Sequence, residues 1–486
     1  MTDIKNPQHL KIALSVRQSF LEMQLDPAKV STLNQANLIR NFYCRLVEYT
    51  PNGELVSSAA KSFEIRNNKV IFEIRPDLKS STGEVLTAQD FYQSFKRLLI
   101  LGKNTHGDLR HLLCGNDPIK NMHDECSGLS VKNNSLIISP MDSHKIKYLI
   151  PLLASVDFSV IPASSIDWTV SNLPIANYSN TSGAYYLASD LSDKTFLLSA
   201  NKNSFYYSSK MPQLITIRSA SPDEALNLFD AKQIDFLPAT YSWGSNVVEK
   251  YKTNKEVLIH ETLPINLWAL RFTKIGFKNT TSAERISLGQ IFKNRFNKIY
   301  PNKNIQKTNQ MFPRLSEGSL TDIQAKEIEA FIGNYSLSFP KKIKLGIPKG
   351  ERVQFESALS DFSWIEYIEL VQAPWTLPQH EQPDFYLTFG DSSFFEDFSL
   401  ISNQMSMGTF NLSKDDGEAW IDKYISQSDK TARLQMLREL HINTLKNGNI
   451  APIGFSSFYS FAQNGWQMEF SKYYVGNPYW QIRWSR

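Results

Sequence analysis

The sequence is poor in the residues and runs that define several protein classes. Three cysteines among 486 residues exclude a small scaffold held together by disulfides. The 52 basic and 48 acidic side chains leave a formal net charge of +4, so no nucleic-acid partner is expected. No run supplies the ~20 mostly apolar residues of a transmembrane helix. The best one, residues 148–166, contains Pro151, Asp157 and Pro162.

The first ten residues, MTDIKNPQHL, carry no basic and apolar export signal. Taken alone, this favours the cytoplasm. A Met placed before a mature, exported chain has the same appearance, so export stays open at this point.

Motifs for catalysis and phosphate binding are missing as well. The stretch LGIPKGER (Leu345–Arg352) lacks the spacing and the Lys-Ser/Thr ending of a phosphate loop. The sequence contains no paired-His zinc helix and no Gly-x-Ser-x-Gly elbow,. We therefore expect a protein that is not an enzyme and that uses no cofactor.

One segment concentrates potential metal ligands, namely His106, His111, Cys114, His123 and Cys126. Two interpretations are open. The first is a metal site, although the spacing matches no established zinc pattern. The second is a polar loop in which the two cysteines form a local disulfide, provided that the protein is exported.

What the sequence has in abundance is aromatic residues, with 30 Phe, 20 Tyr and 9 Trp. These side chains bring contact area and stacking faces to a core and to a binding cleft. The length suggests about three domains or subdomains.

Strand and helix patterns alternate along the whole chain. Leu10–Val16 and Lys69–Ile74 are apolar or alternating and predict strands,. Residues 31–48 are expected to form one helix. Thr87 and Asp90 form a capping-box pattern before a further helix,.

Two more helix boundaries are marked by their capping residues. Ser221-Pro222-Asp223-Glu224 combines a cap, a proline in the first turn and an acid three residues after the cap,. A later helix begins near Asp429 and stops at Gly448,. On it, the lone His441 is expected to be a partly buried structural residue. The mixture predicts an α/β fold.

Four segments together resemble the family-5 extracellular solute-binding proteins, the oligopeptide- and dipeptide-binding class that serves ABC importers. The most specific is IFEIRPDLKSSTGEVLTAQDFYQSFKRLL (Ile71–Leu99), which looks like the family's strand, Gly turn and Thr-Ala-x-Asp helix start. The other three are Leu25–Ile65, Thr181–Phe236 and Asp429–Ile453. They follow the family's order and span most of the chain, while the region of about 263–455 is the most divergent.

The resemblance implies a two-lobed periplasmic-binding-protein-like fold (class II, cluster C) with an extra subdomain in the first lobe. Lobe I would comprise residues 1–43, 156–262 and 456–486, the extra subdomain 44–155, and lobe II 263–455. The lobes would close about the two crossings.

The resemblance also implies a function. We expect an extracytoplasmic binding protein, periplasmic and lipid-anchored in its precursor, which acts as a monomer. It would capture short peptides and deliver them to ABC importer permease subunits in the membrane. Two alternatives stay open: a ligand-sensing domain of a regulator, and a binding protein for a nickel complex, haem or a sugar.

Site residues are carried over by position. In the family, an Asp that ends a late strand pairs with the peptide's α-amino group, and Asp391 is the expected equivalent, with Asp397 as the second choice. Its neighbours Phe389 and Gly390 would line the site. Further lining residues are expected where the lobes meet: Trp268, Trp243, Tyr241, Phe20 and Met23. Core packing is the alternative for each aromatic residue.

Overall fold

A computed structural model describes the chain with the exception of residues 1–7, 16–19, 21–24, 31, 102–106, 116–118, 241–242, 315, 334–341, 371–373, 375–376, 392–400, 402–403, 406–407, 477 and 486. The chain divides into two units. Unit 1 holds Met1–Trp243, Val248–Glu261 and Tyr459–Arg486. Unit 2 holds Gly244–Val247 and Thr262–Phe458. The chain therefore passes between the units at 261/262 and at 458/459, and a short segment at 244–247 also clusters with unit 2.

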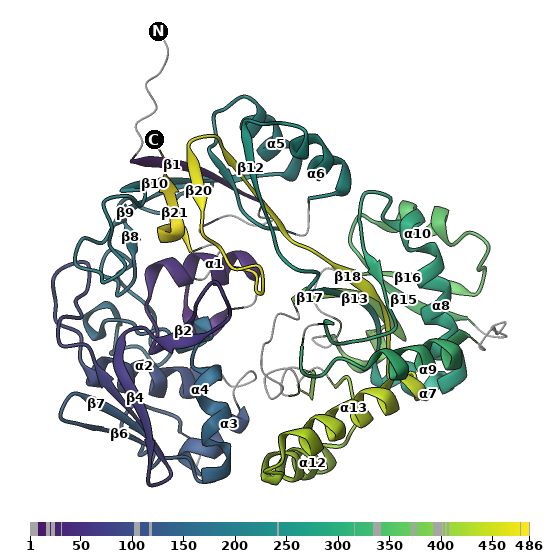
Figure 1. The fold of residues 1–486 in the computed structure, drawn as a ribbon, viewed down its shortest axis with the longest axis horizontal. Helices are drawn as coiled ribbons and strands as arrows, with labels where there is room; N and C mark the ends of the chain where they lie inside the picture. Colours follow the sequence, from purple (N-terminus) through teal and green to yellow (C-terminus); the bar gives the residue numbers. More distant parts are fainter. Residues whose placement is uncertain are drawn as a thin grey trace. The chain divides into compact units, whose positions relative to one another are not determined.

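Unit 1 is built on a seven-stranded mixed sheet in the order β12-β19-β11-β1-β10-β9-β8 (Figure 1). Its strands are β1 (His9–Ser15), β8 (Tyr185–Leu187), β9 (Thr195–Ala200), β10 (Leu214–Ala220), β11 (Phe236–Leu237), β12 (Val257–Glu261) and β19 (Tyr459–Gln463). Strand β1 runs parallel to β10 and to β11. The run predicted at Leu10–Val16 is thus β1, because Leu10, Ile12 and Leu14 are buried on one side of it.

A second, antiparallel sheet of unit 1 has the order β4-β5-β7-β6. Its strands are β4 (Ala60–Arg66), β5 (Lys69–Ile74), β6 (Leu129–Lys132) and β7 (Ser135–Ile138). Two short hairpins complete the strands of the unit: β2 (Val47–Tyr49) with β3 (Leu55–Ser57), and β20 (Trp466–Met468) with β21 (Ile482–Trp484). The segment predicted as a subdomain, 44–155, contains this sheet, but its apolar residues belong to the core of the whole unit.

The helices of unit 1 are α1 (Leu33–Phe42), α2 (Ala88–Leu101), α3 (Gly107–Cys114), α4 (Ile146–Leu152) and α5 (Pro222–Asp230), while α6 (Ser245–Lys252) begins in the segment that clusters with unit 2. Their caps follow the sequence. The Asp90 carboxylate accepts the N–H of Thr87 (2.8 Å) before α2, and Ser221 Oγ accepts the N–H of Glu224 (3.2 Å) in α5.

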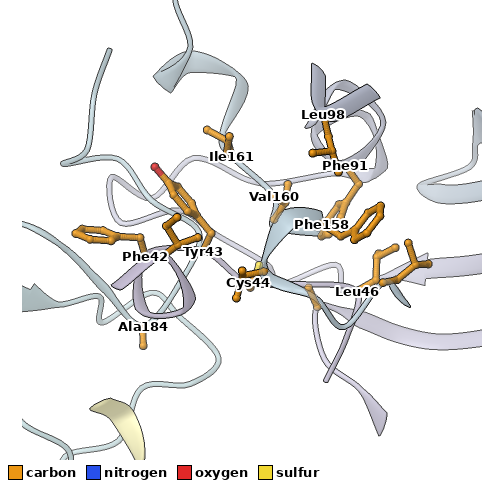
Figure 2. Close-up of a cluster of buried hydrophobic side chains, with 14 of the residues drawn as sticks. Phe42, Tyr43, Cys44, Leu46, Phe91, Leu98, Phe158, Val160, Ile161 and Ala184 are labelled. Carbon is orange, nitrogen blue, oxygen red and sulfur yellow. The ribbon is translucent and has the colours of Figure 1, made fainter. Parts of the chain in front are cut away.

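The helix expected over residues 31–48 is too long. Helix α1 ends at Phe42, Tyr43 is extended, and β2 begins at Val47. Tyr43, Cys44 and Leu46 are all completely buried. A helix with one solvent face cannot bury consecutive side chains in this way, so the chain leaves the helix and enters the core in an extended form. Figure 2 shows these residues, with Phe91 and Leu98 of α2 beside Phe158.

Unit 2 contains a six-stranded sheet in the order β14-β18-β13-β17-β15-β16. The strands are β13 (Asn266–Phe272), β14 (Gln306–Lys307), β15 (Ile343–Pro348), β16 (Ile365–Leu370), β17 (Phe385–Asp391) and β18 (Ile450–Ser456). The helices are α7 (Lys274–Asn279), α8 (Ser282–Ile299), α9 (Asp322–Gly333), α10 (Arg352–Ala358), α12 (Lys414–Ser426) and α13 (Lys430–Lys446). Helices α8 and α10 lie along one face of the sheet (Figure 1), and their Phe292, Phe296 and Phe355 join its core.

The helix predicted from Asp429 is α13. The Asp429 carboxylate caps its first turn through the N–H groups of Thr431 and Ala432, and Gly448 follows its end with a φ of +62°. His441 on this helix is completely buried. Its Nε2 accepts the N–H of Met311 (3.0 Å) and its Nδ1 lies 3.1 Å from the carbonyl of Gly318. Burial lowers its pKa to about 3, so it is a neutral structural histidine.

Within the described ranges, no helix combines the length and the apolar character needed to cross a membrane.

Candidate functional site

The candidate site of unit 2 lies at one end of its sheet. Strands β16 and β17 run parallel to β15, so all three end at the same edge. Asp391 closes β17 there, and β13, which runs antiparallel to β17, starts there at Asn266. In open α/β sheets, ligands bind outside the carboxyl ends of the parallel strands. This edge is therefore the expected ligand side of the unit.

Three polar residues lie next to one another across this edge. Asn266 of β13 is the register partner of Asp391 on one side and of Ser456 on the other. Ser456 Oγ accepts hydrogen bonds from Asn266 Nδ2 and from Trp268 Nε1, both of 2.9 Å. We call Ser456, Asn266 and Asp391 the polar row.

An aromatic layer lies one step further into the sheet. Trp268 is the register partner of Phe389, and their ring centroids are 4.8 Å apart. The Trp268 ring also packs against Phe296 (5.1 Å) and Tyr300 (5.3 Å). Trp268 is only 2% exposed. Trp268 belongs to the core of unit 2 and contacts the polar row through its hydrogen bond to Ser456.

A hydrogen bond between a tyrosine and a carboxylate lies beside this layer. Tyr300 donates its hydroxyl proton to Glu351 Oε2 (2.7 Å), and burial, together with the Glu351 carboxylate, raises the pKa of Tyr300. Burial also lowers the pKa of Lys303 to about 8, against the opposing effect of Glu351. Unit 2 thus brings acidic and basic groups close to the aromatic layer.

The corresponding edge of unit 1 lies at the carboxyl ends of β1, β10 and β11. Phe20, after β1, is 1% exposed and packs edge-on against Phe196 at 4.8 Å. Trp243 is 5% exposed, donates its Nε1–H to the carbonyl of Pro238 (2.9 Å) and packs on Phe461 (6.2 Å). Both side chains are held inside unit 1.

The predicted site residues therefore fall into two groups. Phe389, Gly390 and Trp268 lie together with the backbone of Asp391 at the edge of unit 2. Tyr241, Met23, Asp397 and the side chain of Asp391 lie outside the described residues. Their ligand-binding roles stay predictions.

Sequence reasoning missed Asn266 and Ser456. The only signal in the sequence is a polar residue at the start of NLWALRF and another at the end of IAPIGFS. Neither residue is unusual by itself, because short polar residues commonly flank strands. Their meeting depends on the register between two strands that are far apart in the chain, because the sequence separation of Asn266 and Ser456 is 190.

The disulfide interpretation of the His and Cys segment is found in the structure, whereas His106 and the side chain of His111 lie outside the described residues. Cys114 and Cys126 form a disulfide, with their Cα atoms 4.3 Å apart. Among the residues that the structure describes, no group of three or more His, Cys, Asp or Glu side chains is arranged to hold a metal ion. Cys44 is a free thiol whose pKa burial raises to about 12.

Two α/β units, each built on a mixed sheet, with the chain passing between them at two points, match the two-lobed fold of periplasmic binding proteins. Solved structures with this fold include Listeria monocytogenes OppA bound to peptide (TM-score 0.74, 15% identity, 99% of this chain and 100% of that chain) and NikA from Staphylococcus aureus in complex with Ni(L-His)2 (TM-score 0.71, 14% identity, 98% of this chain and 100% of that chain). The solved structure of the Escherichia coli murein tripeptide binding protein MppA matches with a TM-score of 0.74 and 16% identity, covering 99% of each chain. The fold expected from the sequence resemblance is confirmed.

Sequence comparisons give shorter matches. A putative binding protein of Haemophilus influenzae is 26% identical over 225 residues, 44% of this chain and 40% of that protein. The periplasmic murein peptide-binding protein MppA of Escherichia coli is 36% identical over 76 residues, 15% of this chain and 14% of that protein. These matches span less than half the length of either relative. No protein-family model matches the chain.

Proposed function

We propose that this chain is an extracytoplasmic solute-binding protein that captures short peptides and delivers them to the permease of an ABC importer. The chain shares its fold with peptide-binding proteins, and two partial sequence relatives are described as binding proteins. The observation that carries the proposal is the position of Asp391. It ends β17 at the carboxyl edge of the parallel strands and is the register partner of Asn266.

The chemistry of a peptide fits such an edge. A peptide ammonium that is enclosed by protein is a buried charge and needs a carboxylate partner. Asp391 is our choice for that carboxylate. The peptide main chain can be bound by strand-like pairing, which does not depend on the ligand's side chains, and bridging waters can adapt to side chains of different shapes. Phe389, Gly390 and Trp268 would line the site in unit 2, and Tyr241, Trp243, Phe20 and Met23 in unit 1.

The disulfide supports an exported location. Cys114–Cys126 would persist in the periplasm or outside the cell, where conditions are oxidising, and would be rare in the cytosol. We propose an exported, lipid-anchored and monomeric protein. Its lobe I would have a core at 1–43, 156–262 and 456–486 and an extra subdomain at 44–155, and its lobe II would comprise 263–455. Fractionation of its native cells tests this: recovery of all of it from the cytoplasm would overturn the proposed location.

Calorimetry tests the peptide function directly. Asp391→Asn should weaken the binding of free-amine tripeptides by about 30-fold or more, because removal of one partner of a buried charge pair costs about 2–5 kcal/mol. N-acetylated tripeptides should bind the wild type poorly. If Asp391→Asn binds free-amine peptides as tightly as the wild type, Asp391 is not the anchor. If the wild type binds no peptide in a mixed library, the proposed function fails.

Tryptophan fluorescence tests the lining residues. A ligand-dependent shift should be present in the wild type and should shrink when Trp243 and Trp268 are both replaced by Phe. An undiminished shift in the double variant would show that neither indole senses the ligand.

A further inference from the structure

The Asn266 side chain forms a hydrogen bond through its amide nitrogen but, among the described residues, none through its amide oxygen. It is 2% exposed, and its Nδ2 donates to Ser456 Oγ (2.9 Å). Its Oδ1 is closed off from solvent and has no hydrogen-bond partner among the described residues. A buried acceptor without a donor keeps the cost of its lost hydration, so an unpaired acceptor in such a place needs an explanation.

No described neighbour of Asn266 donates a hydrogen bond to this oxygen. Ser456 Oγ already accepts from Asn266 Nδ2 and from Trp268 Nε1, and the Trp268 ring is fixed by Phe389, Phe296 and Tyr300. These contacts hold the amide plane in place. Asn266 is also the central member of the polar row, directly opposite Asp391 in register.

The chemistry of the proposed ligand supplies a donor of the right kind. A primary ammonium group carries three N–H donors. A single carboxylate oxygen pair at Asp391 accepts two of them at most in a close ion pair, and the third requires another acceptor. Asn266 Oδ1 is a preorganised, unused acceptor next to Asp391 in the sheet.

We propose that Asn266 Oδ1 accepts the third N–H of the ligand's α-ammonium group, and that Asn266 therefore selects primary amines over N-alkylated ones. This inference rests on the proposed peptide-binding function. It adds a specificity-determining residue to the anchor at Asp391, and it predicts a ligand class defined by an unmodified amino terminus.

A double-mutant cycle between protein and ligand tests the proposal. The probes are Ala-Ala-Ala and its N-methyl derivative, which keeps the positive charge but has two N–H donors. In the wild type, N-methylation should weaken binding about tenfold or more, as expected for the loss of a hydrogen bond to a charged group. In Asn266→Leu, which removes the amide, N-methylation should change the affinity less than about twofold.

A matched control separates this role from packing. Asn449→Leu removes another buried amide of unit 2, whose Nδ2 donates to the carbonyl of Phe410 (2.9 Å). Asn449 precedes β18 and so lies at the opposite end of that strand from Ser456, so the preference for the primary amine should persist in this variant. If Asn266→Leu does not fold, Asn266→Asp takes its place: it keeps an acceptor at this position and should keep or increase the preference.

The outcomes are distinct from those for the proposed function. If the wild type binds the tripeptide and Asp391→Asn weakens it, but the wild type and Asn266→Leu discriminate equally between the two probes, this inference is wrong and the peptide function stands. If the wild type binds neither probe nor any peptide, both fail.

Discussion

The two units repeat one sheet topology with different contents. In unit 1 the strand order is β12-β19-β11-β1-β10, and in unit 2 it is β18-β13-β17-β15-β16. In each set, the last three strands run parallel, and the strand before them is antiparallel. In this comparison β11 is the counterpart of β17. The predicted site residues 241 and 243 come after β11, and the predicted site residues 389–391 are the last residues of β17.

The repetition extends to one carboxylate. Asp235 precedes β11 and its Oδ2 accepts the N–H of Lys11 (3.0 Å). Asp384 precedes β17 and its Oδ2 accepts the N–H of Lys344 (2.8 Å). The main chain of each Asp also donates to the carbonyl of the same lysine, at 2.8 and 2.9 Å. Each carboxylate therefore fixes the register of the central parallel strands at the end away from the expected ligand edge.

The difference lies at the ligand edge. Strand β11 is only Phe236–Leu237 and is followed by Pro238, whereas β17 continues for seven residues to Asp391. A proline lacks the N–H that a central strand needs, so the chain of unit 1 leaves the sheet at Pro238 and continues as a loop. Unit 2 keeps strand pairing up to the edge. The two units thus share a sheet, and the length of one strand, β11 or β17, determines whether the ligand edge is formed by a loop, as in unit 1, or by the polar row, as in unit 2.

The largest expected effect comes from a buried ion pair of unit 1. Arg97 donates to Asp26 through Nη1 (2.8 Å) and Nη2 (2.6 Å) and to the carbonyl of Leu173 through Nε (2.8 Å). Unit 2 instead buries Arg271 against Gln404 and Thr409. Arg97→Met leaves the Asp26 carboxylate buried without its charged partner and should lower the free energy of unfolding of unit 1, measured in urea, by about 3–5 kcal/mol.

The control for this variant is Arg218→Met. Arg218 forms an exposed pair with Glu224 at 2.7 Å, and its loss should cost about 1 kcal/mol or less. Equal losses in the two variants would contradict the assignment of Arg97 as the main charged contact of unit 1.

The second effect concerns the disulfide, which again belongs to unit 1. All three cysteines lie in this unit. Replacement of Cys114 and Cys126 by Ser opens a loop with a sequence separation of 12 and should cost about 3 kcal/mol. Thermal unfolding with and without a reductant checks this result. The stability of the double variant should not depend on the reductant, because its remaining cysteine, Cys44, is a free thiol. A stability that still depends on the reductant would contradict this prediction.

The third effect belongs to unit 2 and depends on pH. The pKa of His441 is lowered to about 3 by burial, whereas a histidine in the unfolded chain titrates near 6.5. Between these values the unfolded state binds the proton and the folded state does not, so stability is complete above pH 6.5 and falls as the pH decreases. At pH 5 the loss should be about 2 kcal/mol relative to pH 8.

His441→Gln should remove this part of the acid sensitivity, as measured by urea unfolding at pH 5 and pH 8. His380→Gln, at a side chain with most of its surface exposed, is the matched control and should leave the pH dependence unchanged. An unaltered slope in His441→Gln would show that other groups cause the acid sensitivity.

Local sequence patterns predicted the elements well where the cause was local. The strand at Lys69–Ile74 and the helices capped by Ser221 and Asp429 are found at these positions, because alternation and capping are set by neighbours in the chain. The helix over 31–48 was too long, since the burial of residues 43–46 is decided by distant partners. The polar row could not be predicted because residues 266, 391 and 456 meet only through sheet register.

The smallest effect on stability is expected at Gly390, where a substitution tests the ligand edge of unit 2 through peptide affinity. An added Cβ at this position meets no atom of the described residues within 4 Å, so Gly390→Ala should change the free energy of unfolding by less than about 0.5 kcal/mol. Gly183→Ala is the contrast, because its Cβ would lie 2.5 Å from the carbonyl carbon of Phe42 and unit 1 should be clearly destabilised.

If Gly390 lines the peptide site, the new methyl group occupies space next to Asp391 and should weaken tripeptide binding in calorimetry by about tenfold, the order expected for steric overpacking of 1–3 kcal/mol. Unchanged stability with unchanged affinity would remove Gly390 from the site and shift the ligand edge towards Asn266 and Ser456.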